Sequence, residues 1–449
     1  MIELLVVISI VGTLSSILLA SFSSAKEKGN DAKKIIEVKS VSTALELYKS
    51  NNDGSGPGTR DFKSTEGYPA TTADGSTVGP VTEGTVAYTD TMQKLVNNGV
   101  LTAIPTSPDG RSYSYFNPGL PNGAGIIFSA ILSGDNTASG SGGSLFVSVK
   151  PTVVGQITTA TSPIYGTVSG NYAYVVNNSN SMQVFDISNP SSPVLKGAVN
   201  TGTFPVFITV SGNYAYVANY YSNSMQVIDI SNPSSPVLKG EVATDPYPDS
   251  IAISGNYAYV ANYYSNSMQV IDISNPSSPV IKSTTVDGQK LHSIAVSGNY
   301  AYVAATASES MIVFDISNPF SPTEVSTTVT GNRPHAIAVS GGYAYMANPN
   351  SNSVQIIGIS NPASPVIKGE VATDAFPHPI AISGNYAYVA NQISNSFQVI
   401  DISNPASPVV KNTISISSFP NSITISGNYA YVINTNDSLL QVIKIGGGL

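Results

Sequence analysis

The sequence predicts a multidomain protein with a long N-terminal α-helix, a small α+β domain, and then an all-β seven-bladed propeller. Three observations support this prediction. An apolar stretch over residues 1–20 continues into a segment with helical periodicity. A Gly- and Ser-rich segment over residues 133–150 separates two halves of different composition. From residue 151 onward, a strand-like motif recurs at a nearly constant spacing of about 43 residues.

Composition limits the classes of function. The chain has 449 residues, enough for two or three domains. Charged residues are only 10% of the chain and the formal net charge is −8, so we expect no nucleic-acid partner. Cysteine is absent, which excludes disulfides, thiolate catalysis and cysteine-ligated metals. A cysteine-free chain rich in Ser, Asn and Tyr suits an extracellular protein stabilised by β-sheet.

The first 20 residues are apolar except for one charge, Glu3. About 20 apolar residues in a helix can cross a hydrocarbon layer of roughly 30 Å. A carboxylate inside such a stretch is costly, so it indicates a function and a partner. An ordinary membrane anchor with a stalk is the alternative interpretation, but it does not explain Glu3.

The helix is predicted to continue to about residue 51. Residues recurring every three or four positions mark one apolar stripe. They are Ile35, Val38, Val41, Leu45 and Tyr48. The stretch Asn51-Asn52-Asp53-Gly54 ends the helix. A helix over about residues 1–51 is roughly 75 Å long, too long for one small domain to cover.

This N-terminal region resembles type IV pilins and type II secretion pseudopilins. The resemblance rests on Ile2-Glu3-Leu4-Leu5-Val6-Val7-Ile8 and on Gly12, and it covers residues 1 to about 132. In that family the mature chain usually begins two residues earlier with an N-methylated Phe, which this sequence lacks. The family's proline eight residues after the glycine is Ala20 here.

The resemblance implies a pilin-like domain over residues 1–132 that forms a helical filament of identical subunits. The helix would reside in the inner membrane before assembly. A prepilin peptidase and the pilus assembly machinery would be partners. Glu3 would meet the N-terminal ammonium of a neighbouring subunit, and Gly12 would let the helix bend.

Residues 53–132 are predicted to form the small α+β headpiece. A short helix is expected from Thr89 to Asn98, and strands are expected over residues 113–117 and 126–132. Related pseudopilins hold calcium in this domain, but acidic residues are sparse here, mainly Asp109 and Asp135. We therefore expect no cofactor. Residues 133–150 are expected to be a flexible linker.

Residues 151–449 are predicted to form the propeller. The glycines of a Ser-Gly-Asn/Gly-Tyr-Ala-Tyr motif are Gly170, Gly212, Gly255, Gly298, Gly341, Gly384 and Gly427. A period of about 40 to 45 residues is typical of one four-stranded blade. The repeats resemble LVIVD and YVTN propellers through Val-Ile-Asp-Ile-Ser-Asn-Pro and Pro-His-Ala-Ile-Ala-Val-Ser. That resemblance concerns the fold far more than the function.

One repeat shows the expected strand order. Residues 250–254 are the inner strand, 257–261 the second and 268–273 the third, and the outer strand begins at Val280. The segment Pro151-Thr-Val-Val-Gly155 reads as an outer strand that precedes any inner strand. The seventh repeat ends after its third strand. We therefore expect the N-terminal strand to complete the last blade, which closes the ring.

Two recurring charged positions are interpreted as structural. Lys196, Lys239, Lys282, Lys368 and Lys411 lie on outer strands, where charge blocks edge-to-edge aggregation. Asp186, Asp229, Asp272, Asp315 and Asp401 end the third strands, where they can cap the turn into Ser-Asn-Pro.

The variable loops at one end of the ring are the predicted ligand-binding face. Binding residues concentrate on loops held by a rigid scaffold, and exposed aromatic side chains suit glycan or protein contacts. The candidates are Tyr220, Tyr221, Tyr247, Tyr263, Tyr264, Arg333, Phe376 and Phe419, together with Phe204.

An arc of polar residues is predicted around the central channel. Six residues before the motif glycines, the seven blades carry Ile164, Val206, Asp249, His292, His335, His378 and Asn421. Imidazole and carboxylate groups suit zinc or copper. The preferred interpretation is that these side chains cap a wet channel mouth, so we expect no metal. No nucleophile motif supports a Ser-His-Asp triad.

Taken together, we expect a structural, non-enzymatic subunit of an extracellular type IV pilus-like filament. Its propeller would be displayed on the surface for cell adhesion or ligand binding. A type II secretion pseudopilin and a filament- or membrane-tethered propeller enzyme are the alternatives. The histidines are the one feature that favours the enzyme.

Overall fold

The computed structural model describes residues 81–82, 113–116, 127–131, 137–141, 144–148 and 151–445. The chain divides into two compact units, residues 1–150 with 446–449, and residues 151–445. The expectations for the helix of residues 1–51, for Glu3 and Gly12, for the helix from Thr89 to Asn98 and for calcium lie outside the described residues. Within the described ranges, no helix has the length and apolar character needed to span a membrane.

The first unit contains one five-stranded antiparallel sheet in the order β1-β2-β3-β4-β5. Its strands are β1 Val81–Thr82, β2 Tyr113–Phe116, β3 Ile127–Ile131, β4 Thr137–Ser141 and β5 Ser144–Ser148. The antiparallel pairing of β2 with β3 agrees with the sequence prediction.

The structure differs from the sequence prediction over the linker. Strands β4 and β5 form a hairpin inside residues 133–150, with Ser141 opposite Ser144. The two residues between them are Gly142 and Gly143, a pair that favours a tight hairpin turn. The abundance of Gly and Ser in this segment hides that signal.

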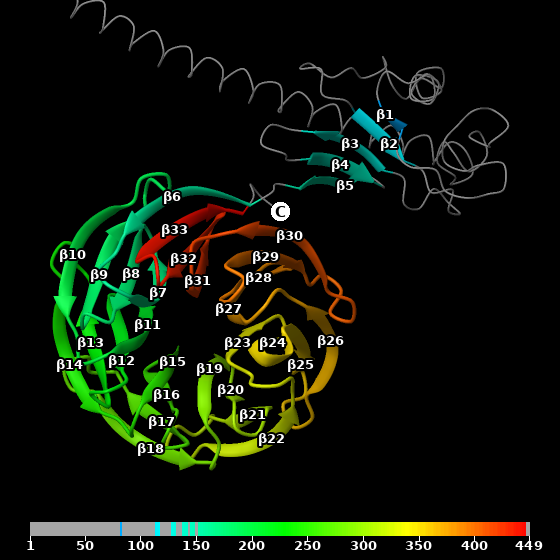
Figure 1. Ribbon diagram of the computed structural model, residues 1–449. Coiled ribbons are helices and arrows are strands. Elements are labelled where there is room, and N and C mark those ends of the chain that lie inside the picture. The colour runs from blue at the N-terminus through cyan, green and yellow to red at the C-terminus, as the bar shows by residue number, and fades with distance from the viewer. Residues whose placement is uncertain are drawn as a thin grey trace, which may run out of the picture. The chain divides into compact units, whose positions relative to one another are not determined.

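The second unit is a ring of seven four-stranded antiparallel sheets (Figure 1). The inner strands are β7 Pro163–Ser169, β11 Pro205–Ser211, β15 Pro248–Ser254, β19 Leu291–Ser297, β23 Ala336–Ser340, β27 Pro377–Ser383 and β31 Pro420–Ser426. The second strands are β8 Tyr172–Asn177, β12 Tyr214–Asn219, β16 Tyr257–Asn262, β20 Tyr300–Ala305, β24 Tyr343–Asn348, β28 Tyr386–Asn391 and β32 Tyr429–Asn434. Each blade thus begins at the channel and proceeds outward, as the repeat predicts.

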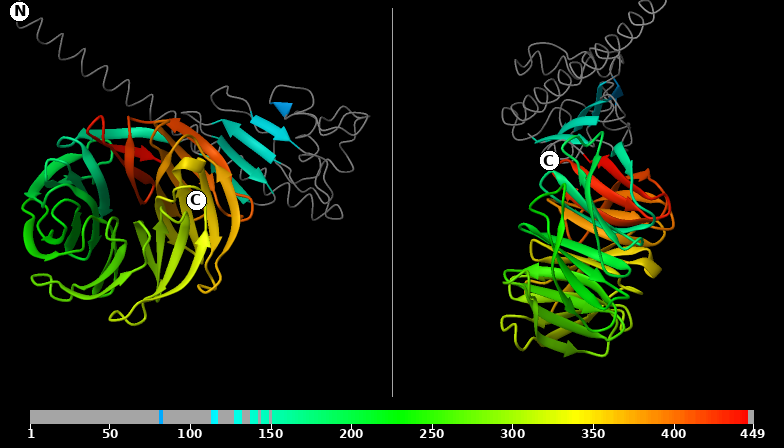
Figure 2. Two further views of the ribbon diagram at one scale, coloured as in Figure 1. Left: turned by 60° about the horizontal axis from the view of Figure 1, so that its bottom comes forward. Right: turned by 90° about the vertical axis from the view of Figure 1, so that its left-hand side faces the viewer.

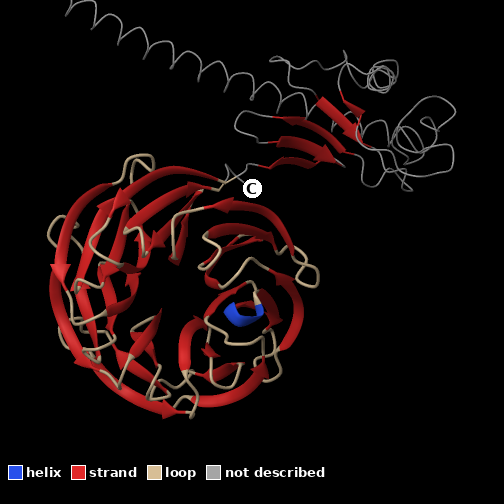
Figure 3. Ribbon diagram, viewed as in Figure 1, coloured by secondary structure: helices blue, strands red, loops and turns tan. Residues whose placement is uncertain are grey.

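The two outer layers complete the blades. The third strands are β9 Ser181–Asp186, β13 Ser224–Asp229, β17 Ser267–Asp272, β21 Ser310–Asp315, β25 Ser353–Gly358, β29 Ser396–Asp401 and β33 Leu439–Lys444. The outer strands are β10 Val194–Asn200, β14 Val237–Ala243, β18 Val280–Val286, β22 Thr323–Val329, β26 Val366–Ala372, β30 Val409–Ser415 and β6 Thr152–Thr158. A short 3-10 turn, Pro349–Ser351, joins β24 to β25 and appears as the blue segment in Figure 3.

The ring closes by a strand from the beginning of the propeller. Strand β6 pairs antiparallel with β33, with Thr158 opposite Leu439 and Thr152 opposite Lys444. Figure 1 shows β6 beside β33 at the outside of the last blade. The prediction that the N-terminal strand completes the seventh blade is confirmed, so β33 has no unpaired edge.

The core lies between neighbouring blades. The middle strands are buried on both faces, which explains their nearly continuous apolar sequence. Between the third and fourth blades, Met268 and Val270 pack with Ile294, Val303 and Phe314. The further views in Figure 2 show the sheets following one another around the ring. Each blade therefore needs both neighbours to bury its faces.

A second contact joins each outer strand to the turn of the next blade. A Cβ on Gly240 would lie 2.3 Å from the Pro276 carbonyl oxygen. At the equivalent position of the next blade, the Ser283 hydroxyl donates to the Pro319 carbonyl at 2.8 Å. Glycine or serine at this position thus lets outer strand and turn approach closely.

The recurring aspartates cap turns, as predicted. The Asp272 Oδ1 accepts from the Ser274 backbone N–H at 2.9 Å and from its hydroxyl at 2.6 Å. These hydrogen bonds lower the pKa of Asp272. Lys282 also forms an ion pair with Asp272 at 3.1 Å, so this lysine has a partner in its own blade.

Candidate functional site

The loops at one end of the ring are bound to one another across blades. These are the loops from each outer strand to the next inner strand and the loops between second and third strands. The Tyr220 N–H donates to the Phe204 carbonyl at 2.9 Å, and the Phe204 N–H donates to Asn180 Oδ1 at 2.9 Å. The predicted grouping of the variable loops on one face therefore agrees with the structure.

Five bulky side chains on this face have a left-handed backbone. The φ values are 57° for Phe204, 62° for Tyr247, 57° for Arg333, 65° for Phe376 and 60° for Phe419. All five lie eight residues before a motif glycine and directly before a proline. A left-handed conformation is costly for bulky residues and, where it persists, it indicates a functional constraint.

Asparagine side chains from the preceding blades hold four of these positions. Each accepts a hydrogen bond from the backbone N–H of the bulky residue at 2.9 Å. The pairs are Asn180 with Phe204, Asn223 with Tyr247, Asn352 with Phe376, and Asn395 with Phe419. The strained conformation is thus built into the repeat, and it places an aromatic residue at the same point of four blades.

Six aromatic rings on this face, from Phe204 to Tyr263, form one continuous arc, whereas Phe376 and Phe419 lie outside this series of ring contacts. From Phe204 the ring centroids are separated by 4.7 Å to Tyr221 and then 5.4 Å to Tyr220. From Tyr220 the separation is 4.7 Å to Tyr247, followed by 4.8 Å to Tyr264. Tyr263 lies 5.1 Å from Tyr264 and 5.6 Å from the His292 ring, where the arc meets the histidines.

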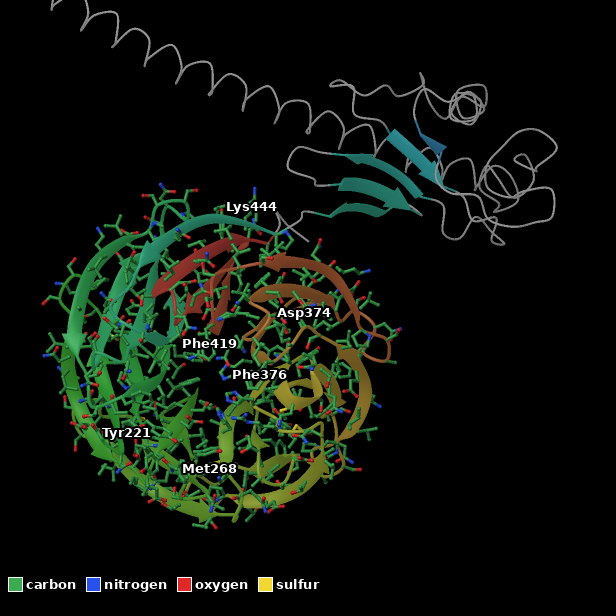
Figure 4. All side chains as sticks on the ribbon, viewed as in Figure 1. Tyr221, Met268, Asp374, Phe376, Phe419 and Lys444 are labelled. Carbon is green, nitrogen blue, oxygen red and sulfur yellow. The ribbon has the colours of Figure 1, made fainter. Side chains whose placement is uncertain are left out.

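The tyrosine side chains of the aromatic arc differ in their exposure to solvent. Tyr221 is 57% exposed and Tyr264 is 56% exposed. Tyr220 is half-buried, and burial raises the pKa of its phenol, so the group is uncharged near neutral pH. Figure 4 places Phe376 and Phe419 nearer the central opening than Tyr221. The arc therefore offers flat apolar surface with hydroxyl groups at its edge.

Two cations lie over the aromatic rings. The Lys290 ammonium is 5.3 Å from the ring centroids of both Tyr263 and Tyr264. The Arg333 guanidinium is 5.7 Å from the Phe376 ring centroid. Arg333 was predicted on this face, whereas Lys290 was missed. The sequence contained a signal for Lys290, because this residue also lies eight residues before a motif glycine, Gly298.

The histidines form a line along the inner strands. Asp249 Oδ2 lies 3.1 Å from His292 Nδ1. The ring centroids are 3.4 Å apart between His292 and His335, and 3.8 Å apart between His335 and His378. The Nε2 atoms of His335 and His378 are 3.1 Å apart. The structure thus brings together four residues of the predicted polar arc around the channel.

The other residues of the predicted polar arc do not add a free polar group to this line. Asn421 accepts a hydrogen bond from Gln392 Nε2 at 2.9 Å, so its side-chain oxygen is already engaged. Ile164 and Val206 are apolar and bring no polar group to the channel. The polar residues at this repeat position therefore lie on neighbouring blades on one side of the ring.

Burial keeps the line of histidines uncharged. Burial lowers the pKa of His292 to about 3 and that of His378 to about 4, and it lowers the pKa of His335 strongly. Burial also raises the pKa of Asp249 to about 8. Some surface still faces the channel, because the His292 side chain is 21% exposed. Within residues 151–445, no three His, Asp or Glu side chains are placed to hold one metal ion.

Comparison with known proteins agrees with the repeat. The LVIVD repeat matches residues 167–201, 207–244, 247–287, 289–330, 334–373, 378–415 and 420–443. No curated protein matches the chain.

Several solved structures are similar in fold. Hydrazine synthase of Kuenenia stuttgartiensis has 19% identity and a TM-score of 0.55, covering 65% of this chain and 98% of that chain. The β-propeller domain of Cps50 (Swd1) from Myceliophteria thermophila has 8% identity and a TM-score of 0.57, covering 66% and 100%. A putative 6-phosphogluconolactonase from Bacteroides fragilis has 17% identity and a TM-score of 0.51, covering 64% and 92%. At these identities the likeness concerns the fold alone.

Proposed function

Because the chain belongs to the LVIVD repeat family, we propose that residues 151–445 form a ligand-binding propeller displayed by a type IV pilus-like filament. The observation that carries the binding role is the aromatic arc from Phe204 to Tyr263. Its rings are continuous across blades, and two of its tyrosines are more than half exposed. Loops that vary on an otherwise regular scaffold are the usual place for binding residues.

The chemistry of the arc favours a glycan as the ligand. Aromatic faces pack against the apolar C–H faces of sugars, and tyrosine hydroxyls supply hydrogen bonds at the edge. The left-handed backbone at Phe204 and Tyr247 fixes these side chains before a ligand arrives, so little conformational entropy is lost on binding. Lys290 and Arg333 add positive charge beside the rings, which favours acidic sugars.

The filament part of the proposal rests on the sequence of residues 1–51. Glu3 inside an apolar stretch, followed by a sequence with an apolar stripe at helical spacing, supports polymerisation by helix packing in a filament core. An unpaired carboxylate in a dry core is costly, whereas a carboxylate that meets a neighbouring N-terminal ammonium is tolerated. Glu3 would therefore select the correct register between subunits, and the propeller would remain on the filament surface.

A binding experiment tests the role of the arc. Full-length chain in detergent is applied to an array of neutral and acidic glycans, together with Tyr221→Ala/Tyr264→Ala. Phe320→Ala is the matched control, because Phe320 is 61% exposed but lies in a Ser-Asn-Pro turn away from the arc. We expect the control to bind like the parent and the double variant to lose about tenfold or more in affinity. Equal binding by the two variants, or binding of proteins alone, would reject a glycan site on the arc.

Electron microscopy of surface filaments tests the display. Labelling with an antibody against the propeller is expected to decorate the whole shaft. Glu3→Ala is expected to reduce filament yield while the protein stays folded, whereas Glu27→Ala, beyond the apolar stretch, is the control. Label confined to short periplasmic filaments would favour the pseudopilin alternative, and turnover of glycosidic or ester substrates would favour the enzyme.

A further inference from the structure

The contact between His335 and His378 is the strongest feature that the aromatic arc does not use. Their Nε2 atoms lie 3.1 Å apart, and the two residues belong to adjacent blades at equivalent positions of the repeat. Both rings sit where the blades surround the channel, and His335 is only 8% exposed. Two ring nitrogens from adjacent blades therefore lie within reach of one bound atom.

The separation of these nitrogens suits two ligands of one metal ion. Zinc–imidazole bonds are about 2.0–2.1 Å long, so two ligands at a tetrahedral angle place their nitrogens about 3.4 Å apart. A slight widening of the present 3.1 Å contact makes room for the ion. The alternative is a direct N–H···N hydrogen bond, which uses the same two atoms but needs one Nε2 to keep its proton.

The surroundings favour the metal-binding form of both rings. Metal ions bind imidazole through a ring nitrogen, and His335 and His378 present their Nε2 atoms to each other at 3.1 Å. The next ring along the line, His292, packs on His335, and its Nδ1 lies 3.1 Å from Asp249 Oδ2. This packing limits rotation of the His335 ring, as supporting groups around metal ligands commonly do.

We propose that His335 and His378 bind one divalent transition-metal ion through their Nε2 atoms, with water in the remaining positions. No third His, Asp or Glu among residues 151–445 is placed to complete the site. Two imidazole ligands suit ions such as Zn²⁺ and Cu²⁺. This inference is independent of the aromatic arc and of the filament.

The test uses full-length protein in detergent, stripped of metal with a chelator. Titration with ZnCl2 is followed by calorimetry, and Cu²⁺ is followed by electron paramagnetic resonance. We expect one ion per chain and superhyperfine coupling to two imidazole nitrogens. His335→Gln and His378→Gln are each expected to weaken binding by more than the roughly 10- to 100-fold that loss of an outer supporting group costs.

Asn421→Ala is the matched control, because Asn421 occupies the same repeat position in the next blade. It is expected to bind metal like the parent. Thermal unfolding of each variant without metal shows whether it is folded, and His335→Asn and His378→Asn replace any glutamine variant that is not. Binding that is absent in the parent, or retained when both histidines are replaced, would overturn the site and leave an imidazole–imidazole hydrogen bond.

Discussion

The side-chain amide of Asn262 donates a hydrogen bond to Gln269 Oε1 at 3.2 Å, inside the third blade. The same oxygen accepts a hydrogen bond from the backbone N–H of Asp245 at 2.9 Å. One buried glutamine thus accepts hydrogen bonds from a side chain at the end of a strand and from the backbone of a blade-to-blade loop. Equivalent Asn–Gln pairs occur in four further blades. The fourth blade has Ala305 and Ile312 at these positions, so both partners are replaced together by apolar residues.

Replacing only one partner is predicted to be costly. Gln269→Leu leaves the Asp245 N–H without its acceptor and removes one of the two acceptors of Asn262 Nδ2, and an unsatisfied buried polar group costs about 1–3 kcal/mol. Denaturant unfolding of Gln269→Leu should therefore show a clear loss of stability. Ile312→Leu at the equivalent position of the fourth blade is the control, and a volume-conserving change there should cost less than about 1.5 kcal/mol. Equal effects of the two substitutions would contradict this role.

Asp287 is predicted to make stability fall as pH rises. Its Oδ1 accepts the Gln289 N–H at 2.8 Å, but its Oδ2 is buried without a hydrogen-bond partner. Burial raises the pKa of Asp287 from 3.8 to about 6. The folded state therefore binds the proton more tightly than the unfolded state. The stabilisation is complete below about pH 4 and is lost as pH rises through about 6.

The test is Asp287→Asn across a pH series. At pH 7 the variant is expected to be more stable than the parent by about 1 kcal/mol, after allowance for solvent screening. Near pH 3.5 the two should melt together. Asp315→Asn is the control with the opposite sign, because a hydrogen bond from Ser317 lowers the pKa of Asp315. A stabilisation by Asp287→Asn that is the same at both pH values would refute the titration.

The contact between outer strand and next blade gives a third prediction. Gly240→Ala places a methyl group against the Pro276 carbonyl and should destabilise by about 1–3 kcal/mol. Gly240→Ser should cost less, because Ser283 and Ser326 donate hydroxyl hydrogen bonds to the equivalent carbonyls at 2.8 and 2.6 Å. Thermal melting of the two variants side by side measures the difference. An alanine variant as stable as the parent would disprove the close contact.

Much of the propeller was predictable because its repeat is regular. The recurring glycines have left-handed φ values, such as 55° at Gly255, which a glycine turn supplies at low cost. The closing strand was predictable because Pro151 begins an outer-strand pattern before any inner strand. The aromatic face followed from the variable loops at one end of the ring, and the line of histidines followed from a shared distance to the motif glycines.

Other features left no comparable signal in the sequence. The Asn262–Gln269 pair looks like ordinary polar residues at strand ends, since pairing across strands depends on register. The left-handed backbone at Phe376 could not be predicted, because phenylalanine does not favour this conformation. It is accompanied by a hydrogen bond to the Asn352 side chain of another blade. Lys290 was missed although Arg333, at the equivalent position of the next blade, was predicted. The roles of Glu3 and Gly12 remain predictions.

The strained position at Phe419 gives the last prediction. Its φ is 60°, its N–H is held by Asn395, and its side chain is 36% exposed, so little packing is lost when it is shortened. Glycine adopts this conformation freely and alanine does not, so Phe419→Gly should be more stable than Phe419→Ala by about 1 kcal/mol. At Phe320, whose φ is not left-handed, glycine should offer no such advantage over alanine. If glycan binding falls equally in both Phe419 variants while stability differs, the strain positions a ligand-binding ring; binding that follows stability would contradict that role.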